Sequence, residues 1–355
     1  AMLGRLLTDK DAGVRLGAVR GIAQVGEKGS WAAVAGVSRC LADPDEDVRR
    51  SVVGALAKVA EKGNLRALAV LANLMEQVLS EAARRTAVEA LAHVAEKGDE
   101  AVIFTMRKML AQRDAGVRLA AVRALAKLAD EGNGEVVDAL CGRLSDANPS
   151  VRQAAVKALA KVDGESSRKV VAAICASLGD PDHVVRRTVV EALQCMTGQG
   201  DEHVLAAACA HLEDQDPDVK CAAVEVLIHV SRRGDGFAVT HLRALMQQED
   251  AAVRRAAVEG LVKVATAGDE SAVVALFSCL LRLMGESTES VSELWPASAL
   301  LHNAEARRAC AAGLGVLAQQ GDERVKRALR SLSEEDPEPD VRRAAQGAME
   351  RFKNW

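Results

Sequence analysis

The chain has 355 residues, of which 49% are hydrophobic and 27% are charged, and its formal net charge is −4 at pH 7. So small a charge excludes a global field that would draw the protein to nucleic acid or to an anionic membrane. Charged residues interrupt every apolar run, which excludes a membrane-spanning helix. Aromatic residues make up 2% of the chain, so the core must be built from Ala, Val and Leu.

The chain opens with Ala1-Met2-Leu3 inside a helical pattern and shows no signal peptide. This opening is also compatible with a fragment of a longer chain from which a targeting segment has been removed. The eight cysteines form no CxxC pair and no zinc-like cluster with His. We therefore expect an intracellular, reducing compartment, most simply the cytoplasm.

A period of about 34 residues is the strongest signal in the sequence. A Val-Arg dipeptide or its equivalent marks each repeat. The ten marks begin at Val14, Val48, Ala83, Val117, Val151, Val185, Val219, Val253, Ala306 and Val341. Their spacing is 34 or 35 residues, except for one interval of 53 residues between Val253 and Ala306. The sequence therefore predicts about ten repeats, with a short or truncated first helix in the first repeat and an insertion in the ninth.

Each repeat contains two amphipathic helices. After the Val-Arg mark the apolar residues follow a helical period, as in Val117, Ala121, Val122, Leu125 and Leu128. A second set of stripes lies upstream of the marks: Val137, Leu140 and Leu144; Val171, Ile174 and Leu178; Leu205, Ala208 and Leu212. Each repeat is thus predicted to be a helical hairpin.

Helix boundaries recur at fixed places in the repeat. Fifteen residues after the mark stand Gly63-Asn64, Gly98-Asp99, Gly132-Asn133, Gly200-Asp201, Gly234-Asp235, Gly268-Asp269 and Gly321-Asp322. We expect Gly to end one helix in the left-handed conformation, and Asp or Asn to cap the next. Between the two helices of a repeat stand Asp43-Pro44-Asp45, Asp180-Pro181-Asp182 and Asp216-Pro217-Asp218, which predict tight corners.

At this point the sequence resembles a known family. The pattern Asp-Pro-Asp-x-x-Val-Arg-x-x-Ala/Val-Val-x-Ala-Leu in residues 43–56 and 180–193 is similar to HEAT repeats of the phycobilisome-lyase-like subclass. The resemblance implies an all-α fold, a single right-handed α-solenoid over residues 1–355. It also implies a scaffold or adaptor that binds a macromolecular partner on its concave surface, although a few such proteins are enzymes.

The arginines of the Val-Arg marks could bind phosphate, but a structural role explains them better. An Asp at the hairpin corner recurs with them, at Asp9, Asp43, Asp146, Asp180, Asp214 and Asp336. We expect a ladder of hydrogen bonds between this Asp and an Arg such as Arg15, Arg49, Arg118, Arg152, Arg186 or Arg254 of a neighbouring repeat. Likewise, Cys141, Cys175 and Cys209 recur every 34 residues, and we interpret them as packing residues. Stacked helices lie about 10 Å apart, too far for a disulfide.

Recognition is expected at positions that vary between repeats on the exposed face of the second helix. Six and ten residues after the mark, the chain places Arg123, Lys127, Lys157 and Lys161, which we name the basic zone. The same positions place Glu191, Glu225 and Glu259, the acidic row, followed by Lys263. Like charges at this spacing repel. Either a partner of opposite charge binds these residues, or they form a merely solvated face.

The insertion near residues 285–303 is rich in Ser and Glu, and we expect it to be a mobile loop. It carries Trp295, which either anchors a partner or folds back over the solenoid edge.

The sequence bears on three functional classes. The sequence has no nucleophile elbow, phosphate loop, dinucleotide fingerprint or His-Glu-x-x-His helix, and we assign no catalytic residue, metal or cofactor. The family resemblance keeps a bilin lyase open, with Glu225, His229 and Cys195 as a loose site. A nucleic-acid-binding solenoid would need a longer basic groove and stacking aromatics. We therefore expect a protein partner and no membrane insertion, and leave the oligomeric state open.

Overall fold

The computed structural model describes residues 2–77, 80–163, 167–283, 304–319 and 322–353. Regular structure in these ranges is entirely helical, and the helices alternate as two members of each repeat. The first helices are α1 (Met2–Leu6), α3 (Trp31–Ser38), α5 (Leu65–Gln77), α7 (Glu100–Met109), α9 (Gly134–Cys141), α11 (Arg168–Ala176), α13 (Glu202–His211), α15 (Gly236–Leu245), α17 (Glu270–Leu283) and α20 (Glu323–Glu335).

The second helices are longer and more uniform. They are α2 (Ala12–Val25), α4 (Glu46–Val59), α6 (Glu81–Val94), α8 (Ala115–Leu128), α10 (Pro149–Val162), α12 (His183–Met196), α14 (Pro217–Val230), α16 (Ala251–Val264), α19 (Ala304–Leu317) and α21 (Pro339–Lys353). The predicted hairpin of each repeat is therefore confirmed in the described ranges. Short 3₁₀ turns, η1 (Arg39–Ala42) and η2 (Ser177–Gly179), follow α3 and α11.

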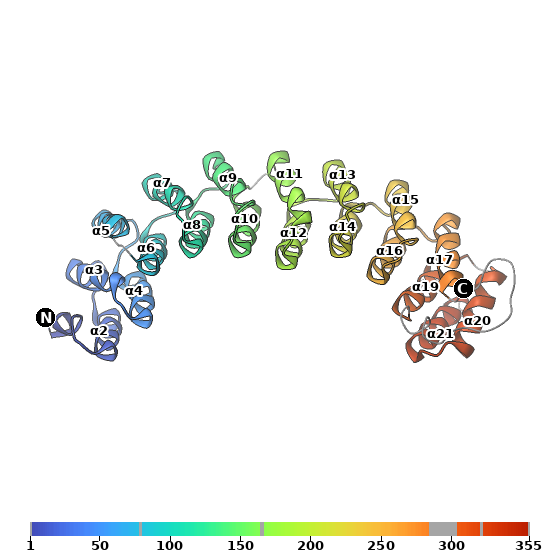
Figure 1. Cartoon of the computed structure of the whole chain (residues 1–355), viewed down its shortest axis with the longest axis horizontal. Helices are drawn as coiled ribbons and strands as arrows, with labels where there is room; N and C mark the ends of the chain where they lie inside the picture. The colour runs from blue at the N-terminus through green and yellow to red at the C-terminus, as the bar shows by residue number, and fades with distance from the viewer. Residues whose placement is uncertain (1, 78–79, 164–166, 284–303, 320–321, 354–355) are drawn as a thin grey trace. The chain divides into compact units, whose positions relative to one another are not determined.

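The chain divides into two compact halves, Ala1–Ala173 and Ile174–Trp355. In the first half α2, α4, α6, α8 and α10 pack side by side in sequence order, and in the second half α12, α14, α16, α19 and α21 do the same. Within each half the second helices form one layer and the first helices form the other (Figure 1). The fold is thus an α-solenoid in which neighbouring repeats share one core.

Local sequence explains where the helices begin. At the start of most second helices an Asp or Asn side chain accepts a backbone N–H, as Asp114 does from Val117 at 2.8 Å; α6, which begins after Ser80, lacks such a bond. Pro149 and Pro217 occupy the first position of α10 and α14, where the missing N–H costs nothing. Asp99 and Asn133 cap α7 and α9 in the same way, which confirms the predicted caps of the first helices.

The core follows the predicted stripes closely but not completely. In α8, Val117, Ala121, Val122, Leu125 and Leu128 are all buried. Seven of the nine residues predicted for the upstream stripes are buried: Val137, Leu140, Val171, Ile174, Leu178, Ala208 and Leu212. Leu205 in α13 and Leu144 in the turn after α9 are half-buried, while Val136 and Val204, which were not predicted, are fully buried. The buried stripe is therefore wider than predicted.

The recurring glycines have another role than the one predicted. Gly63 has a φ of 72°, but α4 has already ended at Val59. The Gly63 N–H donates to the carbonyl of Val94, at the end of α6 in the following repeat, at 2.9 Å. Gly98 and Gly132 donate in the same way to Leu128 and Val162, each at 2.7 Å. Each glycine thus bridges two repeats instead of closing its own helix.

The cysteines are not uniformly core residues. Four are buried, three are half-buried and Cys195 is exposed. Burial raises the pKa of the Cys175 and Cys209 thiols to about 11, as expected of packing residues that stay protonated.

The predicted insertion at residues 285–303 and its Trp295 lie outside the described residues. Among the helices that the structure describes, none is long and apolar enough to cross a membrane.

Candidate partner-binding surface

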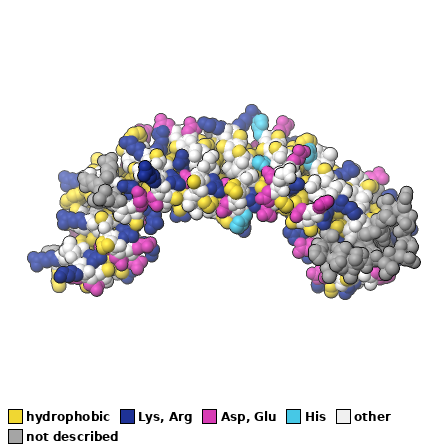
Figure 2. Space-filling model, viewed as in Figure 1, with side chains coloured by type: hydrophobic (Ala, Val, Ile, Leu, Met, Phe, Trp, Pro, Cys, Tyr) yellow, Lys and Arg dark blue, Asp and Glu magenta, His cyan; other side chains and the backbone are white. Residues whose placement is uncertain are grey.

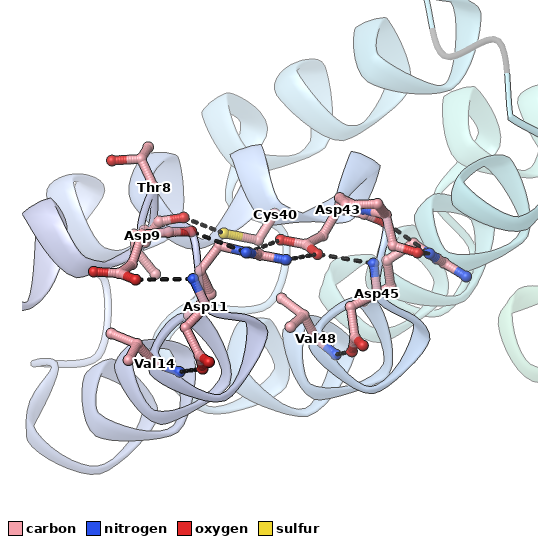
Figure 3. Close-up of polar contacts among 12 residues, drawn as sticks. Thr8, Asp9, Asp11, Val14, Cys40, Asp43, Asp45 and Val48 are labelled. Atoms are coloured by element: carbon pink, nitrogen blue, oxygen red, sulfur yellow. Dashed lines mark hydrogen bonds and ion pairs between the residues drawn. The ribbon is translucent and has the colours of Figure 1, made fainter.

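The recurring arginines of the Val-Arg marks form hydrogen bonds within and between repeats. The Arg15 Nε and Nη2 atoms donate to the two carboxylate oxygens of Asp43, at 2.7 and 2.8 Å. Its Nη1 donates to the carbonyls of Asp9 and Lys10 in its own hairpin corner. Figure 3 shows Asp9 in the corner of the first repeat and Asp43 in the corner of the second, and Arg15 bonds to both. One side chain therefore closes a corner and joins two repeats.

The same bidentate pair recurs along the chain. Arg118 donates to Asp146 at 2.7 and 2.6 Å, and Arg307 donates to Asp336 at 2.8 and 3.1 Å. Asp43, Asp146 and Asp336 also accept a backbone N–H two residues later. The predicted Arg to Asp ladder is confirmed at these rungs, which leaves no free guanidinium there for a phosphate.

Pairing with Arg favours the ionised form of Asp43 and Asp146. Burial alone would raise the pKa of Asp43 and of Asp146. The hydrogen bonds from Arg15 and Arg118, together with the corner N–H, outweigh burial and lower the pKa of both groups below the usual value.

Some pairs of neighbouring repeats have other residues or other partners in place of the bidentate Arg to Asp pair. Where the chain has Lys220, its Nζ donates to Gln248 of the next repeat at 3.2 Å. Arg186 turns to Asp218, at 3.1 Å. Arg49 Nη1 donates to the carbonyls of Asp43 and Pro44 in its own corner, and its buried Nε has no hydrogen-bond partner among the described residues.

The basic zone lies on α8 and α10, which pack side by side in the N-terminal half. The side chains of Arg123, Lys127, Lys157 and Lys161 are all exposed. Within the described part of the chain, no ion pair involves any of the four. The structure therefore brings the predicted basic residues together on one surface, and the stack does not neutralise them.

Lys127 has basic neighbours from three other repeats. Its Nζ is 3.2 Å from Nδ1 of His93 on α6. Partial burial, then the charges of Lys62 and Lys161, lower the pKa of Lys127. Partial burial, then the charges of Lys127 and Lys62, lower the pKa of His93. Four successive repeats thus contribute basic groups whose proximity disfavours the charged forms of Lys127 and His93.

Lys62 was not predicted as part of this surface, because it lies in the loop after α4 and a helical period does not place loop residues. His93 stands ten residues after its mark, at the same repeat position as Lys127. Its contact with Lys127 follows from repeat stacking and could have been inferred by comparing neighbouring repeats at that position.

The acidic row lies in the C-terminal half. Glu191, Glu225 and Glu259 are exposed on α12, α14 and α16, and Lys263 is exposed one turn after Glu259. Glu191 pairs with Arg187 of its own helix at 3.2 Å, so one member of the row is partly neutralised. On the face seen in Figure 2, basic and acidic side chains are interspersed over both halves. The basic zone is therefore a local feature.

The loose bilin site is poorly formed. Cys195 is exposed on α12, and His229 on α14 is half-buried. The His229 ring Nε2 is 3.3 Å from the carbonyl of Thr197, so the imidazole contacts backbone. No group of three or more potential metal ligands occurs among the described residues.

Comparisons with known proteins agree with this architecture. A family model described as HEAT repeats matches residues 1–92, 108–194, 137–212 and 205–283. No curated protein matches the chain.

Three similar solved structures share the fold. The Kap95:Nup1 complex has a TM-score of 0.62 at 13% identity, over 99% of this chain and 50% of that chain. Kap121p bound to RanGTP has a TM-score of 0.58 at 14% identity, over 99% and 40%. Importin Beta in an ammonium sulfate condition has a TM-score of 0.58 at 13% identity, over 99% and 50%. The chain spans half or less of these relatives' length, and at such identity the likeness shows the fold alone.

Proposed function

Because the chain belongs to the HEAT repeat family, we propose that it is a scaffold or adaptor that binds a protein partner on the layer of second helices. The sequence predicts that this layer is the concave surface. Within that layer, we propose that the partner binds the basic zone. The observation that carries this proposal is Lys127, which lies among His93, Lys62 and Lys161.

Different positions of the repeat have different roles, and this supports the proposal. The Arg to Asp rungs and the glycine N–H bonds hold the repeats together, and they use positions that recur in most repeats. The positions that differ between repeats remain exposed. In a repeat array these are the positions at which a partner can be distinguished without loss of stacking. Kap95 with Nup1 and Kap121p with RanGTP are similar solenoids solved with protein partners.

The chemistry of the basic zone favours an acidic segment. Lys127 loses hydration and is repelled by two other lysines, so a carboxylate placed between them would relieve both costs. Neighbouring helices lie about 8 to 10 Å apart, while an extended chain advances about 3.3 Å per residue. An extended partner that crosses α6, α8 and α10 would therefore present an acidic residue at about every third position.

The aromatic residues favour protein over nucleic acid. Single-stranded nucleic acid is usually held by aromatic side chains that stack on the bases. The exposed large aromatic residues of the described part are Trp31, Phe104 and Phe237, and they lie on α3, α7 and α15, in the layer of first helices. The basic zone therefore has no stacking platform beside it.

Within the family we propose the phycobilisome-lyase-like subclass, from the corner motif of residues 43–56 and 180–193. We further propose that residues 1–355 form one solenoid.

Affinity capture tests the proposed function. The native chain is compared with Lys127→Glu/Lys161→Glu, and captured proteins are identified by mass spectrometry. The matched control is Arg66→Glu/Lys108→Glu, which makes the same change in charge on exposed residues of α5 and α7. We expect a protein that the native chain and the control retain and the second-helix variant loses. Equal capture by both variants would contradict the proposal, and loss of bound nucleic acid instead of protein would favour the other class of partner.

A further inference from the structure

The ninth repeat breaks the pattern of the second-helix layer. Six residues after the mark the other described repeats of the C-terminal half carry Glu191, Glu225, Glu259 and Gly347, and ten residues after it they carry Cys195, His229, Lys263 and Arg351. In α19 these two positions are Ala312 and Val316. Both are exposed, Val316 at 37%. Helix α19 therefore presents short apolar side chains where α16 presents Glu259 and Lys263 and α21 presents Arg351.

A groove of about 450 Å³ lies over this part of α19. Its floor is apolar and includes Val262, Ala309, Ala312, Val316 and Ala344. Such a volume is within the range of about 300 to 1,000 Å³ typical of ligand sites.

Close helix packing keeps the floor of the groove in place. A Cβ on Gly313 would lie 2.5 Å from Val262 Cγ2 on α16, and a Cβ on Gly315 would lie 2.6 Å from the Ala348 Cβ on α21. Because α19 touches both neighbours through these glycines, the groove cannot close by a further approach of the helices. The groove is deep because the side chains of Ala312 and Val316 are short, and not because the helices are separated.

The rim of the groove is mainly basic. Lys263, Arg308 and Arg351 line it together with one acid, Glu259, which gives three positive charges against one negative charge. Arg308, Arg351 and Lys263 are exposed, and within the described part of the chain no ion pair involves any of them. An occupant should therefore combine an apolar body with negative charge at its ends.

We propose that this groove binds a segment of a protein partner in which one or two large apolar side chains are flanked by Asp or Glu. The apolar side chains lie over Ala312 and Val316, and the flanking carboxylates pair with Arg308, Arg351 and Lys263. This inference rests on the proposed function, to which it adds a second contact of different chemistry. The groove is open along α19 and continuous with Glu259 and Lys263 of the neighbouring repeat, which suits an extended chain or a helix.

A selection from random peptides displayed on phage tests the groove. The native chain is compared with Ala312→Lys, which fills the groove with the residue that Lys157 provides at the same position of α10. This variant should fold, and it adds positive charge, so a loss of acidic peptides cannot be due to charge repulsion. A second variant, Arg308→Glu/Arg351→Glu, reverses the rim. Glu225→Ala changes the same repeat position on α14 and is the control.

We expect the native chain to enrich peptides with an apolar anchor between acidic residues. Ala312→Lys should lower their affinity by about tenfold or more, the loss expected when one large apolar side chain no longer enters its pocket. The rim variant should also weaken them, and Glu225→Ala should not. Thermal unfolding followed by circular dichroism verifies that all variants fold.

Several outcomes would overturn the inference. One is that no peptide is enriched, or that the enriched peptides bind Ala312→Lys equally well. Another is that oleate occupies the groove while no peptide does, which would assign it to a lipid carboxylate. If the enriched peptides depend on Lys127 and Lys161 alone, the groove inference fails while the proposed function stands. If the enriched peptides depend on the groove alone, the groove inference stands and the assignment of a partner to the basic zone fails.

Discussion

Arg118 shows how a single side chain can serve two repeats. Its Nη1 closes the corner of its own hairpin by donating to the carbonyls of Gln112 and Arg113, while Nε and Nη2 hold Asp146 of the next repeat. The side chains of Arg118 and Asp146 are 12% and 2% exposed. A bidentate pair so well shielded from water is fully engaged in stacking, which explains why these arginines do not make an anion site.

Removal of one partner should therefore be costly. We expect Arg118→Ala to lower the free energy of unfolding by about 3 kcal/mol, because Asp146 is left as a buried charge without its cation. Arg50→Ala is the control, since Arg50 pairs with Glu46 at the exposed surface and such pairs contribute less than about 1 kcal/mol. Urea unfolding followed by circular dichroism measures both, and a loss no larger for Arg118→Ala than for the control would refute this role.

The same pairs predict acid sensitivity. The pKa of Asp43 and Asp146 is lowered in the folded state, whereas an unfolded Asp titrates near pH 3.9. The pairs therefore contribute their full stability above about pH 4 and lose it as the pH falls through the folded-state pKa. In urea unfolding, Asp146→Asn should be less stable than the native chain at neutral pH, and the gap should narrow below about pH 4. A gap that stays constant with pH would contradict the assignment.

The crowding of the basic zone can be tested at His93. Burial, then Lys127 and Lys62, lower the pKa of His93. Lys127→Met should therefore raise this pKa towards the ordinary value of about 6.5, as measured by NMR titration of the imidazole. Lys108→Met on α7 removes a charge from the other layer and should leave the His93 pKa unchanged. An unchanged pKa in Lys127→Met would show that the two groups do not interact in solution.

At the scale of the element, the loops between repeats carry more of the stacking than their sequences suggest. Gly132 has a φ of 77°, and its N–H donates to Val162 at the end of α10. The following Asn133 caps α9. Within two residues the loop thus fixes the neighbouring repeat and starts the next helix.

A pair of substitutions separates the two roles. Nothing lies within 4 Å of a Cβ on Gly132 or on Gly134, so neither Gly→Ala change causes a clash. Gly132→Ala should lower the free energy of unfolding by about 1 kcal/mol, because the left-handed conformation disfavours a Cβ. Gly134→Ala, in the first turn of α9, should be neutral or slightly stabilising. Equal effects in urea unfolding would show that the backbone at Gly132 imposes no special demand.

Periodicity predicted the elements well because each helix buries a stripe that repeats with the helix. Val117 to Leu128 lie where the pattern placed them, and the Arg118 to Asp146 rung follows from two residues that recur together. The role of Gly63 could not be read in this way. A Gly before a capping residue is typical of a helix end, and its true acceptor, Val94, lies in the next repeat.

At the scale of the whole molecule, equivalent positions of successive repeats can be compared with one another. The comparison predicted the basic zone on α8 and α10, and the structure leaves its members exposed and uncompensated. Ala312 and Val316 were not among the predicted residues, although they stand at the same two positions of the ninth repeat and the sequence alone shows that they are apolar. The closeness of Lys62 to Lys127 was beyond its reach, because a loop residue has no fixed direction in a helical pattern.

Once a partner has been captured, its affinity for two charge-matched variants tests the central claim most directly. We predict that Lys127→Glu/Lys161→Glu raises the Kd by about tenfold or more, the equivalent of at least 1.4 kcal/mol. Arg66→Glu/Lys108→Glu should change it by less than about twofold. The native Kd should also rise with salt, since exposed charges are screened. Equal Kd values for the two variants would contradict a binding surface on the second helices.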